Sequence, residues 1–189
     1  MSKRIAYLTA AAFSALAITA TVIAPARAEE KTVMVGGAAM FPSKNIVQNA
    51  VNSKDHTTLV AAVKAAGLVD ILMSPGPFTV FAPVNKAFEK LPKGTVETLL
   101  KPANKGTLTA VLTYHVVAGK LSADDLMSMV KAGGGKATLT TVQGETLTVM
   151  EAGRKLEIID SKGDKSIITI ADVNQSNGVI HVVDTVLLP

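Results

Sequence analysis

Apolar residues follow a helical spacing in the first half of the chain and a strand spacing in the second half. Leu59, Val63 and Ala66 recur at the intervals of one helix face. Gly67 follows them as a residue typical of a helix C-terminus. From Lys136 onward, short runs of β-branched and other apolar residues alternate with turn signals. These runs predict strands at 137–142, 146–150, 155–159, 166–171 and 178–188. Helices followed by strands indicate an α+β fold.

The stretch from Phe78 to Pro92 predicts a strand that turns directly into a short helix. Apolar residues alternate at its start, and Pro83 ends the strand because proline has no N–H for a ladder. Asn85 stands where a helix N-cap would stand. Three of the five phenylalanines lie in this corner, which predicts that it forms the centre of the core. Its candidate structural residues are Thr79, Phe81, Pro83, Asn85 and Phe88.

The first 28 residues have the pattern of a secretory signal peptide. A basic start, an uncharged Ala-rich run over 5–26 and the sequence Ala26-Arg27-Ala28 predict cleavage near Ala28. The uncharged run is also long enough to span a membrane, so an uncleaved anchor is the alternative. We expect cleavage of residues 1–28, release into the periplasm or the medium, and no stable membrane insertion afterwards.

The rest of the chain is long enough for one domain with a sizeable core. Its Gly/Ala-rich start, 29–42, has no clear period, and we expect an N-terminal arm that is disordered up to Met40. Residues 43–189 contain no internal repeat and no long linker, so they predict a single domain.

Net charge and cysteine content narrow the function classes. The formal charge of +4 falls to +1 when the leader's Lys3, Arg4 and Arg27 are removed. A nearly neutral chain argues against a nucleic-acid-binding protein, which would have a basic face. The absence of cysteine excludes disulfides, thiol catalysis and cysteine metal sites.

Neither the histidines nor the acidic residues have the spacing of a catalytic or metal site. His56, His115 and His181 are far apart, and none belongs to a close-spaced ligand pair. His56 lies beside a predicted helix start, where we expect it to be solvated. Asp124-Asp125 stands at another predicted helix start, where carboxylates favour the helix dipole. We therefore expect no catalytic residues, no metal, no cofactor and no enzymatic activity.

Three segments spread over most of the mature chain carry a family signature. They are FTVFAPVNKAF at 78–88, LTYHVVAGKL at 112–121 and NGVIHVVDTVLLP at 177–189. Together they resemble the fasciclin-like domain family (the fasciclin I repeat), in its bacterial secreted single-domain form. The resemblance implies a β-sandwich or wedge with several short helices packed at its side. It also implies structural roles for Asn177, Gly178 and His181 in the last segment.

The same resemblance implies a role in cell adhesion. Tyr114-His115 resembles the Tyr-His motif that the family associates with adhesion and integrin binding. Asp184 lies near a stretch that related animal domains use for receptor contact. The alternative for His115 is a core histidine whose ring nitrogens bond to Asn85 or Thr79, because buried polar groups need partners. Both interpretations of His115 can be true at once, since a buried histidine can maintain the shape of an adhesive surface above it.

We therefore expect a secreted protein that acts in cell adhesion or surface interaction by binding an extracellular or cell-envelope protein or glycan. One alternative is a periplasmic binder of a small hydrophobic ligand, with Tyr114, His115 or a methionine lining a pocket, which a deep apolar cavity would favour. Another is a hydrolase whose site is assembled only by the fold, which would need a pocket holding an acid pair or a His–acid pair.

Overall fold

The computed structural model describes residues 31–189, and the predicted signal peptide lies outside the described residues. The α-helices are α1 (Ile46–Ala50), α2 (Thr57–Ala66), α3 (Val69–Met73), α4 (Asn85–Glu89), α5 (Thr95–Leu99), α6 (Lys105–Tyr114) and α7 (Ala123–Ala132). Two 3₁₀ turns are η1 (Lys54–His56) and η2 (Pro102–Asn104). The strands are β1 (Val33–Val35), β2 (Ala38–Met40), β3 (Phe78–Pro83), β4 (Val116–Ala118), β5 (Lys136–Thr140), β6 (Thr146–Ala152), β7 (Lys155–Ile159), β8 (Lys165–Gln175) and β9 (Gly178–Val183).

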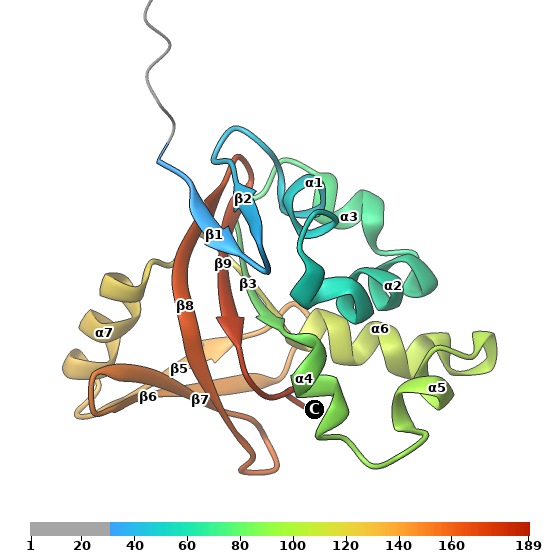
Figure 1. Ribbon diagram of the computed structural model, residues 1–189. Helices are drawn as coiled ribbons and strands as arrows, with labels where there is room; N and C mark the ends of the chain where they lie inside the picture. The colour runs from blue at the N-terminus through green and yellow to red at the C-terminus, as the bar shows by residue number, and fades with distance from the viewer. Residues whose placement is uncertain (1–30) are drawn as a thin grey trace, which may run out of the picture.

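Seven of these strands form one mixed sheet in the order β4-β3-β9-β8-β7-β6-β5. The central pair, β3 and β9, is parallel and sets Phe81 opposite His181. The other neighbours in the sheet are antiparallel. A bridge between Val117 and Thr141 brings the two edges of the sheet together. The sheet therefore curls into a barrel-like wedge (Figure 1).

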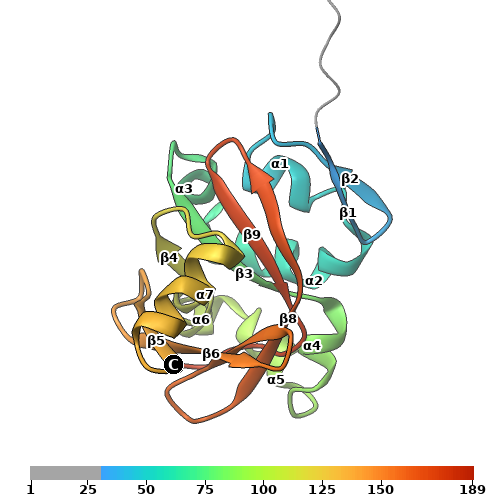
Figure 2. The ribbon, with the colours of Figure 1, turned by 90° about the vertical axis from the view of Figure 1, so that its left-hand side faces the viewer.

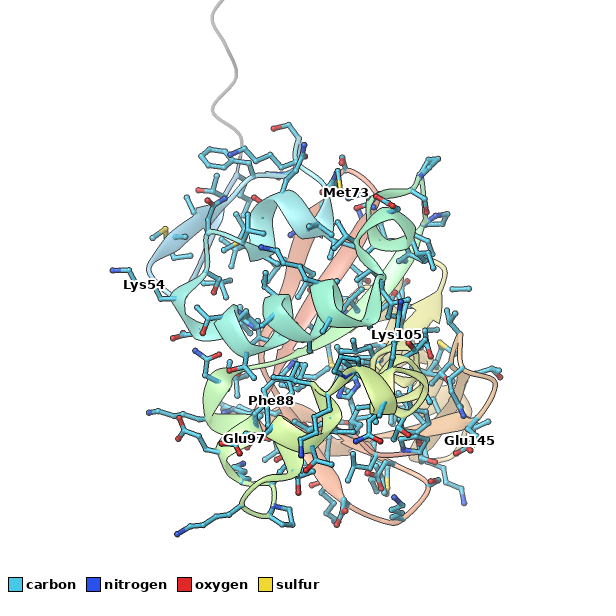
Figure 3. The ribbon with its side chains drawn as sticks, turned by 90° about the vertical axis from the view of Figure 1, so that its right-hand side faces the viewer. Lys54, Met73, Phe88, Glu97, Lys105 and Glu145 are labelled. Carbon is cyan, nitrogen blue, oxygen red and sulfur yellow. The ribbon has the colours of Figure 1, made fainter. Side chains whose placement is uncertain are left out.

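The helices cover the sheet unequally. α1 to α6 lie together on one side of β3, β8 and β9, whereas α7 lies apart from them, beside β5 and β6 (Figures 1 and 2). Figure 3 looks onto α2 and α6 from the helix-covered side. This arrangement confirms the predicted α+β class and the predicted packing of short helices at the side of a wedge.

Two hydrophobic cores result from this arrangement. We call the first the helix-side core, because it packs α1, α2, α3 and α6 against the sheet; it includes Val35, Met40, Ile46, Leu59, Val63, Leu72, Val80, Phe88, Leu112, Val116 and Ile180. We call the second the barrel core, because it lies inside the curled sheet and beneath α7. It includes Phe81, Tyr114, Leu126, Leu139, Leu147, Ile158, Val183 and Leu187.

The start of the described chain differs from the predicted disordered arm. β1 and β2 form an antiparallel hairpin, with Val35 opposite Ala38. Gly36 and Gly37 make its turn at φ values of +57° and +76°, which glycine adopts without steric cost. Val35 and Met40 are buried in the helix-side core. Two short strands joined at two glycines carry too few residues for a visible period, which is why the sequence pattern missed them.

The corner after β3 forms as a strand followed directly by a helix, but Asn85 has a different role from the predicted one. Val84 is the N-cap residue of α4, and Asn85 is the first helical residue. The Asn85 side-chain oxygen accepts from the Thr58 N–H at 3.0 Å, and its amide donates to the Lys54 carbonyl at 2.9 Å. Asn85 thus caps α2, a helix 27 residues earlier in the chain.

The long strand β8 bends so that it can pair with two partners. Its first residues pair with β7 and the remainder pairs with β9, with register shifts between them. Asp172, at the bend, has a φ of +56°, and its carboxylate accepts from the Ala123 N–H at the start of α7 at 2.8 Å. The predicted strand at 166–171 ended too early, because a bulge interrupts the apolar alternation at the bend.

Candidate functional site

Tyr114 and His115 lie at the junction of α6 and β4. α6 ends at Tyr114, His115 is its C-cap residue, and β4 begins at Val116. The helical stripe of Leu108, Val111 and Leu112 continues through one more turn, and packing in the interior outweighs the local preference of tyrosine for a strand.

The Tyr114 side chain is fully buried in the barrel core. Its hydroxyl donates to the Thr146 carbonyl at 3.0 Å and accepts from the Ser161 N–H at 2.9 Å. These two bonds tie the end of α6 to β6 and to the loop after β7. Tyr114 is therefore held inside the fold by both polar contacts of its hydroxyl.

His115 is buried between the two cores, with 2% of its surface exposed. The Leu187 N–H donates to Nε2 at 3.0 Å, so Nδ1 carries the proton and donates to the Val111 carbonyl at 2.8 Å. These partners replace Asn85 and Thr79, which the sequence suggested. Burial lowers the pKa of His115 to about 4, although the Val111 carbonyl and the charge of Asp160 oppose the shift.

His181 occupies an equivalent interior position in β9. The Asp172 N–H donates to its Nδ1 at 3.3 Å, and its Nε2 donates to the Leu121 carbonyl at 2.8 Å. Its ring stacks on Phe81 with centroids 5.8 Å apart. Burial lowers the pKa of His181, and the Leu121 carbonyl and the Asp172 charge oppose this shift. The ring therefore stays neutral and links β9 to the segment before α7.

Thr79 and Asn177 connect segments that are far apart in the sequence. The Thr79 hydroxyl donates to the Gly119 carbonyl at 2.7 Å and accepts from the Leu121 N–H at 2.9 Å. The Asn177 side chain accepts from the Ile46 N–H at 3.0 Å. It also donates to the carbonyls of Leu72 and Ser74, at 2.8 and 2.9 Å.

Gly178, which follows Asn177, permits a close approach of β9 to the backbone of β3. A Cβ atom at this position would lie 2.1 Å from the Phe78 carbonyl oxygen. The backbone of β3 therefore leaves no room for a side chain at Gly178. The parallel pairing begins at Phe78 and Gly178 and ends at Pro83, which lies opposite Val183 of β9.

Asp184 is the one proposed adhesion residue that reaches the surface. Its carboxylate accepts from the Ile167 N–H at 2.9 Å and from the Thr185 hydroxyl at 3.1 Å. It also forms an ion pair with Lys90, 3.5 Å away. Burial alone would raise the pKa of Asp184, but these hydrogen bonds and the Lys90 charge outweigh it and lower the pKa.

His56 is buried, with 4% of its surface exposed, and the expectation that it is solvated is wrong. η1 turns its ring inward, where Nδ1 forms a 2.8 Å hydrogen bond with the Ser53 hydroxyl. Nε2 makes no hydrogen bond of normal geometry within residues 31–189. Burial lowers the pKa of His56, while the nearby Ala82 carbonyl and the Asp55 charge act to raise it.

An apolar cavity of about 80 Å³ lies within the helix-side core. Its walls come from α1, α2, α3 and α6 on one side and from β3, β8 and β9 on the other, and almost no polar surface faces it. Met40 and His115 line this cavity, as the small-ligand alternative predicts, whereas Tyr114 does not. No sequence pattern indicates the cavity, because its lining comes from many elements that contribute ordinary core residues.

The interior polar pairs were also invisible in the sequence. The Asn49 amide donates to the Gln175 side chain, which links α1 to β8. The Asp160 carboxylate accepts from the N–H groups of Lys162 and Asp164, and from that of Leu188. The Asn49–Gln175 pair brings together residues that lie 126 positions apart in the chain, so no local motif announces it.

The described residues lack two further features. Residues 31–189 contain no group of three or more His, Asp or Glu side chains placed to hold a metal ion. Within the same residues, none of the helices combines the length and the apolar character needed to cross a bilayer.

Comparison with known proteins places the chain in a family. The model of the Fasciclin domain matches residues 54–189. A relative from Synechocystis sp., Protein sll1483, is 43% identical over 188 residues, which cover 100% of this chain and 97% of the relative.

A second relative and a solved structure are more distant. The Cell surface glycolipoprotein MPB83 of Mycobacterium bovis is 34% identical over 160 residues, covering 82% of this chain and 64% of that protein. The structure of a FAS1 domain pair from the insect cell adhesion molecule Fasciclin I superposes with a TM-score of 0.71 at 21% identity. The match covers 79% of this chain and 52% of the insect chain, and it bears on the fold alone.

Proposed function

Because the chain belongs to the Fasciclin domain family, we propose that it acts outside the cytoplasm, in adhesion or cell-surface interaction, by binding a protein or a glycan. The signal-peptide pattern at 1–28 supports export to the periplasm or the medium. The name of one similar protein points the same way, since it is a cell surface glycolipoprotein.

The observation that carries a binding function, as opposed to catalysis, is the burial of the chemically active side chains. Tyr114, His115 and His181 each have 2% or less of their surface exposed, and each uses its polar atoms in hydrogen bonds within the fold. Groups held in this way shape a scaffold and are not available to a substrate. The surface of the domain is then the part that meets a partner.

In this proposal, Tyr114 and His115 support an adhesive surface from beneath. They fix the junction of α6 and β4 to β6 and to the chain near Leu187. Asp184 of the last family segment and its ion-pair partner Lys90, which follows α4, both reach the surface, and we assign direct contact to them. An acidic and a basic group side by side suit a partner that has both donors and acceptors.

Saturable binding to isolated cell envelopes tests this function. We expect the mature chain to bind intact envelopes. One of two treatments should abolish this binding: protease, which removes protein, or periodate, which destroys glycan. The stripping that abolishes binding identifies the partner's class. Non-saturable binding, or none, would contradict the proposal.

Matched variants locate the contact. Asp184→Asn removes the charge and keeps an acceptor for the Ile167 N–H, so we expect weaker binding without unfolding. Asp124→Asn, which removes an exposed carboxylate at the start of α7, should bind envelopes as the parent chain does. Equal binding by parent and Asp184→Asn would move the contact elsewhere on the surface.

A second candidate function is the binding of a small hydrophobic ligand. The observation that favours it is the apolar cavity in the helix-side core, because small-molecule sites are concave and mostly apolar. Two of its lining residues, Ile71 and Val142, are large apolar side chains that remain half exposed. Some of the apolar lining is therefore exposed to solvent. The hydrocarbon part of a ligand could make its first contacts there.

A further inference from the structure

We propose that the cavity in the helix-side core binds a small uncharged alcohol, and that Nε2 of His56 is the hydrogen-bond partner of its hydroxyl group. This inference rests on the second proposed function, the binding of a small hydrophobic ligand. It names the chemical class of that ligand and the residue that recognises it. Four features of the cavity lead to it: an unpartnered nitrogen in its wall, a ring that is held in place, apolar surroundings and a small volume.

One polar atom in the cavity wall has no hydrogen-bond partner. His56 lines the cavity, and among the described residues its Nε2 is the one buried side-chain nitrogen or oxygen without a partner. The Ala82 carbonyl lies near enough to influence the pKa of the ring, but it does not form a hydrogen bond of normal geometry with Nε2. The other polar side chains of the wall, Ser53, Thr113 and His115, all have partners. Because an unpartnered buried polar atom is costly, a ligand that bonds to Nε2 removes that cost.

The ring of His56 is held in one orientation by its surroundings. Its Nδ1 forms a 2.8 Å hydrogen bond with the Ser53 hydroxyl. Asn85 fixes the backbone on either side, because its side chain bonds to the Lys54 carbonyl and to the Thr58 N–H. Lys54, which is labelled in Figure 3, is the first residue of η1. Nε2 is therefore preorganised, and a ligand gains the bond without the entropy cost of ordering a mobile side chain.

A hydroxyl group suits Nε2 in either tautomer of the ring. In one tautomer, Nδ1 donates to the Ser53 hydroxyl and Nε2 is an acceptor. In the other, the Ser53 hydroxyl donates to Nδ1 and Nε2 carries the proton. A hydroxyl both donates and accepts, so it satisfies Nε2 in both cases, whereas a ketone or an ether satisfies only the second.

The rest of the wall requires a ligand that is uncharged and otherwise apolar. Almost no polar surface faces the cavity. Burial lowers the pKa of His56, so at neutral pH its ring carries no charge to balance an ion. A carboxylate or an ammonium group placed there would lose its hydration without gaining a counter-charge. A second hydroxyl would also lose its hydration, because Nε2 supplies only one hydrogen bond.

The volume of the cavity limits the size of the ligand. It is about 80 Å³, roughly half of the 150 Å³ cavity that binds benzene in another protein. Half of a benzene molecule is about three non-hydrogen atoms, so the cavity holds a group of about three or four such atoms. A short alcohol such as 2-propanol has this size and carries a single hydroxyl.

NMR titration of the mature chain with 2-propanol and 2-chloropropane tests the inference, because chlorine replaces the hydroxyl with a poor hydrogen-bonding group. We expect both probes to shift the methyl signals of Leu72 and Val80 saturably, and only 2-propanol to shift the ring-nitrogen signal of His56 Nε2. Methyl shifts with both probes, but no response of Nε2 specific to 2-propanol, would overturn the role of the hydroxyl and leave the small-ligand function standing. No saturable methyl shift with either probe would overturn both.

Matched variants measure the hydrogen bond itself. His56→Asn keeps an amide near the position of Nδ1 and removes Nε2, so the affinity for 2-propanol should fall about tenfold relative to that for 2-chloropropane. Met40→Leu changes the same wall without altering a strong hydrogen-bonding group, and should leave the ratio of the two affinities unchanged. An unchanged ratio in His56→Asn, or an equal change in Met40→Leu, would overturn the role of His56. If a variant does not fold, the Nε2 response of the parent chain decides.

Discussion

The two hydrophobic cores of this domain differ in how completely they are filled. Most of the largest side chains with less than 2% exposure, including Tyr114, Phe81, Leu126, Leu147 and Ile158, lie in the barrel core. The helix-side core is built largely from short helices laid against the sheet, and it contains the apolar cavity. A closed sheet fixes its own side chains, whereas helices of five to ten residues leave gaps between their ends. Under the small-ligand proposal, the filled barrel core serves stability and the helix-side core, with its cavity, serves binding.

Matched truncations should separate the cores most strongly. Leu147→Ala in the filled barrel core should lower the free energy of unfolding by about 4–5 kcal/mol. Leu72→Ala, beside the existing cavity, should lower it by about 2–3 kcal/mol, because this side chain already lacks some neighbours. Urea denaturation measures both values. Equal losses would show that the two cores are packed alike.

Removing His115 should affect both cores at once, since the residue lies between them. His115→Ala leaves the Leu187 N–H and the Val111 carbonyl without partners. We expect a loss of about 1–3 kcal/mol in the free energy of unfolding. A melting temperature equal to that of the parent chain would refute this role.

Acid should destabilise the fold through the buried histidines. The folded-state pKa of His115 is about 4, below its ordinary value of 6.5, so the unfolded chain binds more protons between these values. Stability should therefore fall as the pH drops from 6.5, by about 2 kcal/mol at pH 5 from His115 alone.

The lowered pKa values of His56 and His181 act in the same direction. The pKa of Asp184 is also lowered, but its protonation affects the free energy of unfolding only when the pH falls below about 4. Asp184 therefore does not affect the measurement between pH 7 and pH 5. Urea denaturation at pH 7, 6 and 5 makes the measurement. A free energy of unfolding that is constant over this range would contradict the neutral, buried state of these rings.

The smallest expected effect concerns the edge of the helix-side core. Asn85→Ala removes the cap of α2 and should cost about 1 kcal/mol. Asn85→Asp keeps an acceptor for the Thr58 N–H and should lose less. Hydrogen exchange at the first turn of α2 would localise the change, and equal exchange in parent and Asn85→Ala would remove Asn85 from the capping role.

The sequence predicted those parts of the fold whose signals are local. The strands at 146–150 and 155–159 correspond closely to β6 and β7, because turns bound a clean alternation at each end. The resemblance of three segments supplied the family, and the match over residues 54–189 confirms it. The hairpin of β1 and β2 was missed because three-residue strands are too short to show a period.

The candidate sites were less predictable, because burial and partnership are decided by tertiary contacts. Nothing near His56 in the sequence indicates that η1 turns its ring into the interior. Likewise, Asn85 bonds to residues from 54 to 58, and His115 bonds to Leu187, 72 positions away. The cavity is the extreme case, since its lining extends from Val35 to Ile180.

The parallel pairing of β3 with β9 has a consequence for the order of folding. The centre of the sheet joins Phe78–Pro83 to Gly178–Val183, so it cannot close until nearly the whole chain is present. Contacts between residues so distant in sequence form slowly, because a long loop must close first. A chain that crosses a membrane unfolded, from its N-terminus onward, benefits from this delay. β9, the strand that completes the sheet, is among the last segments to be made. The topology therefore disfavours folding of the sheet before the chain has crossed the membrane.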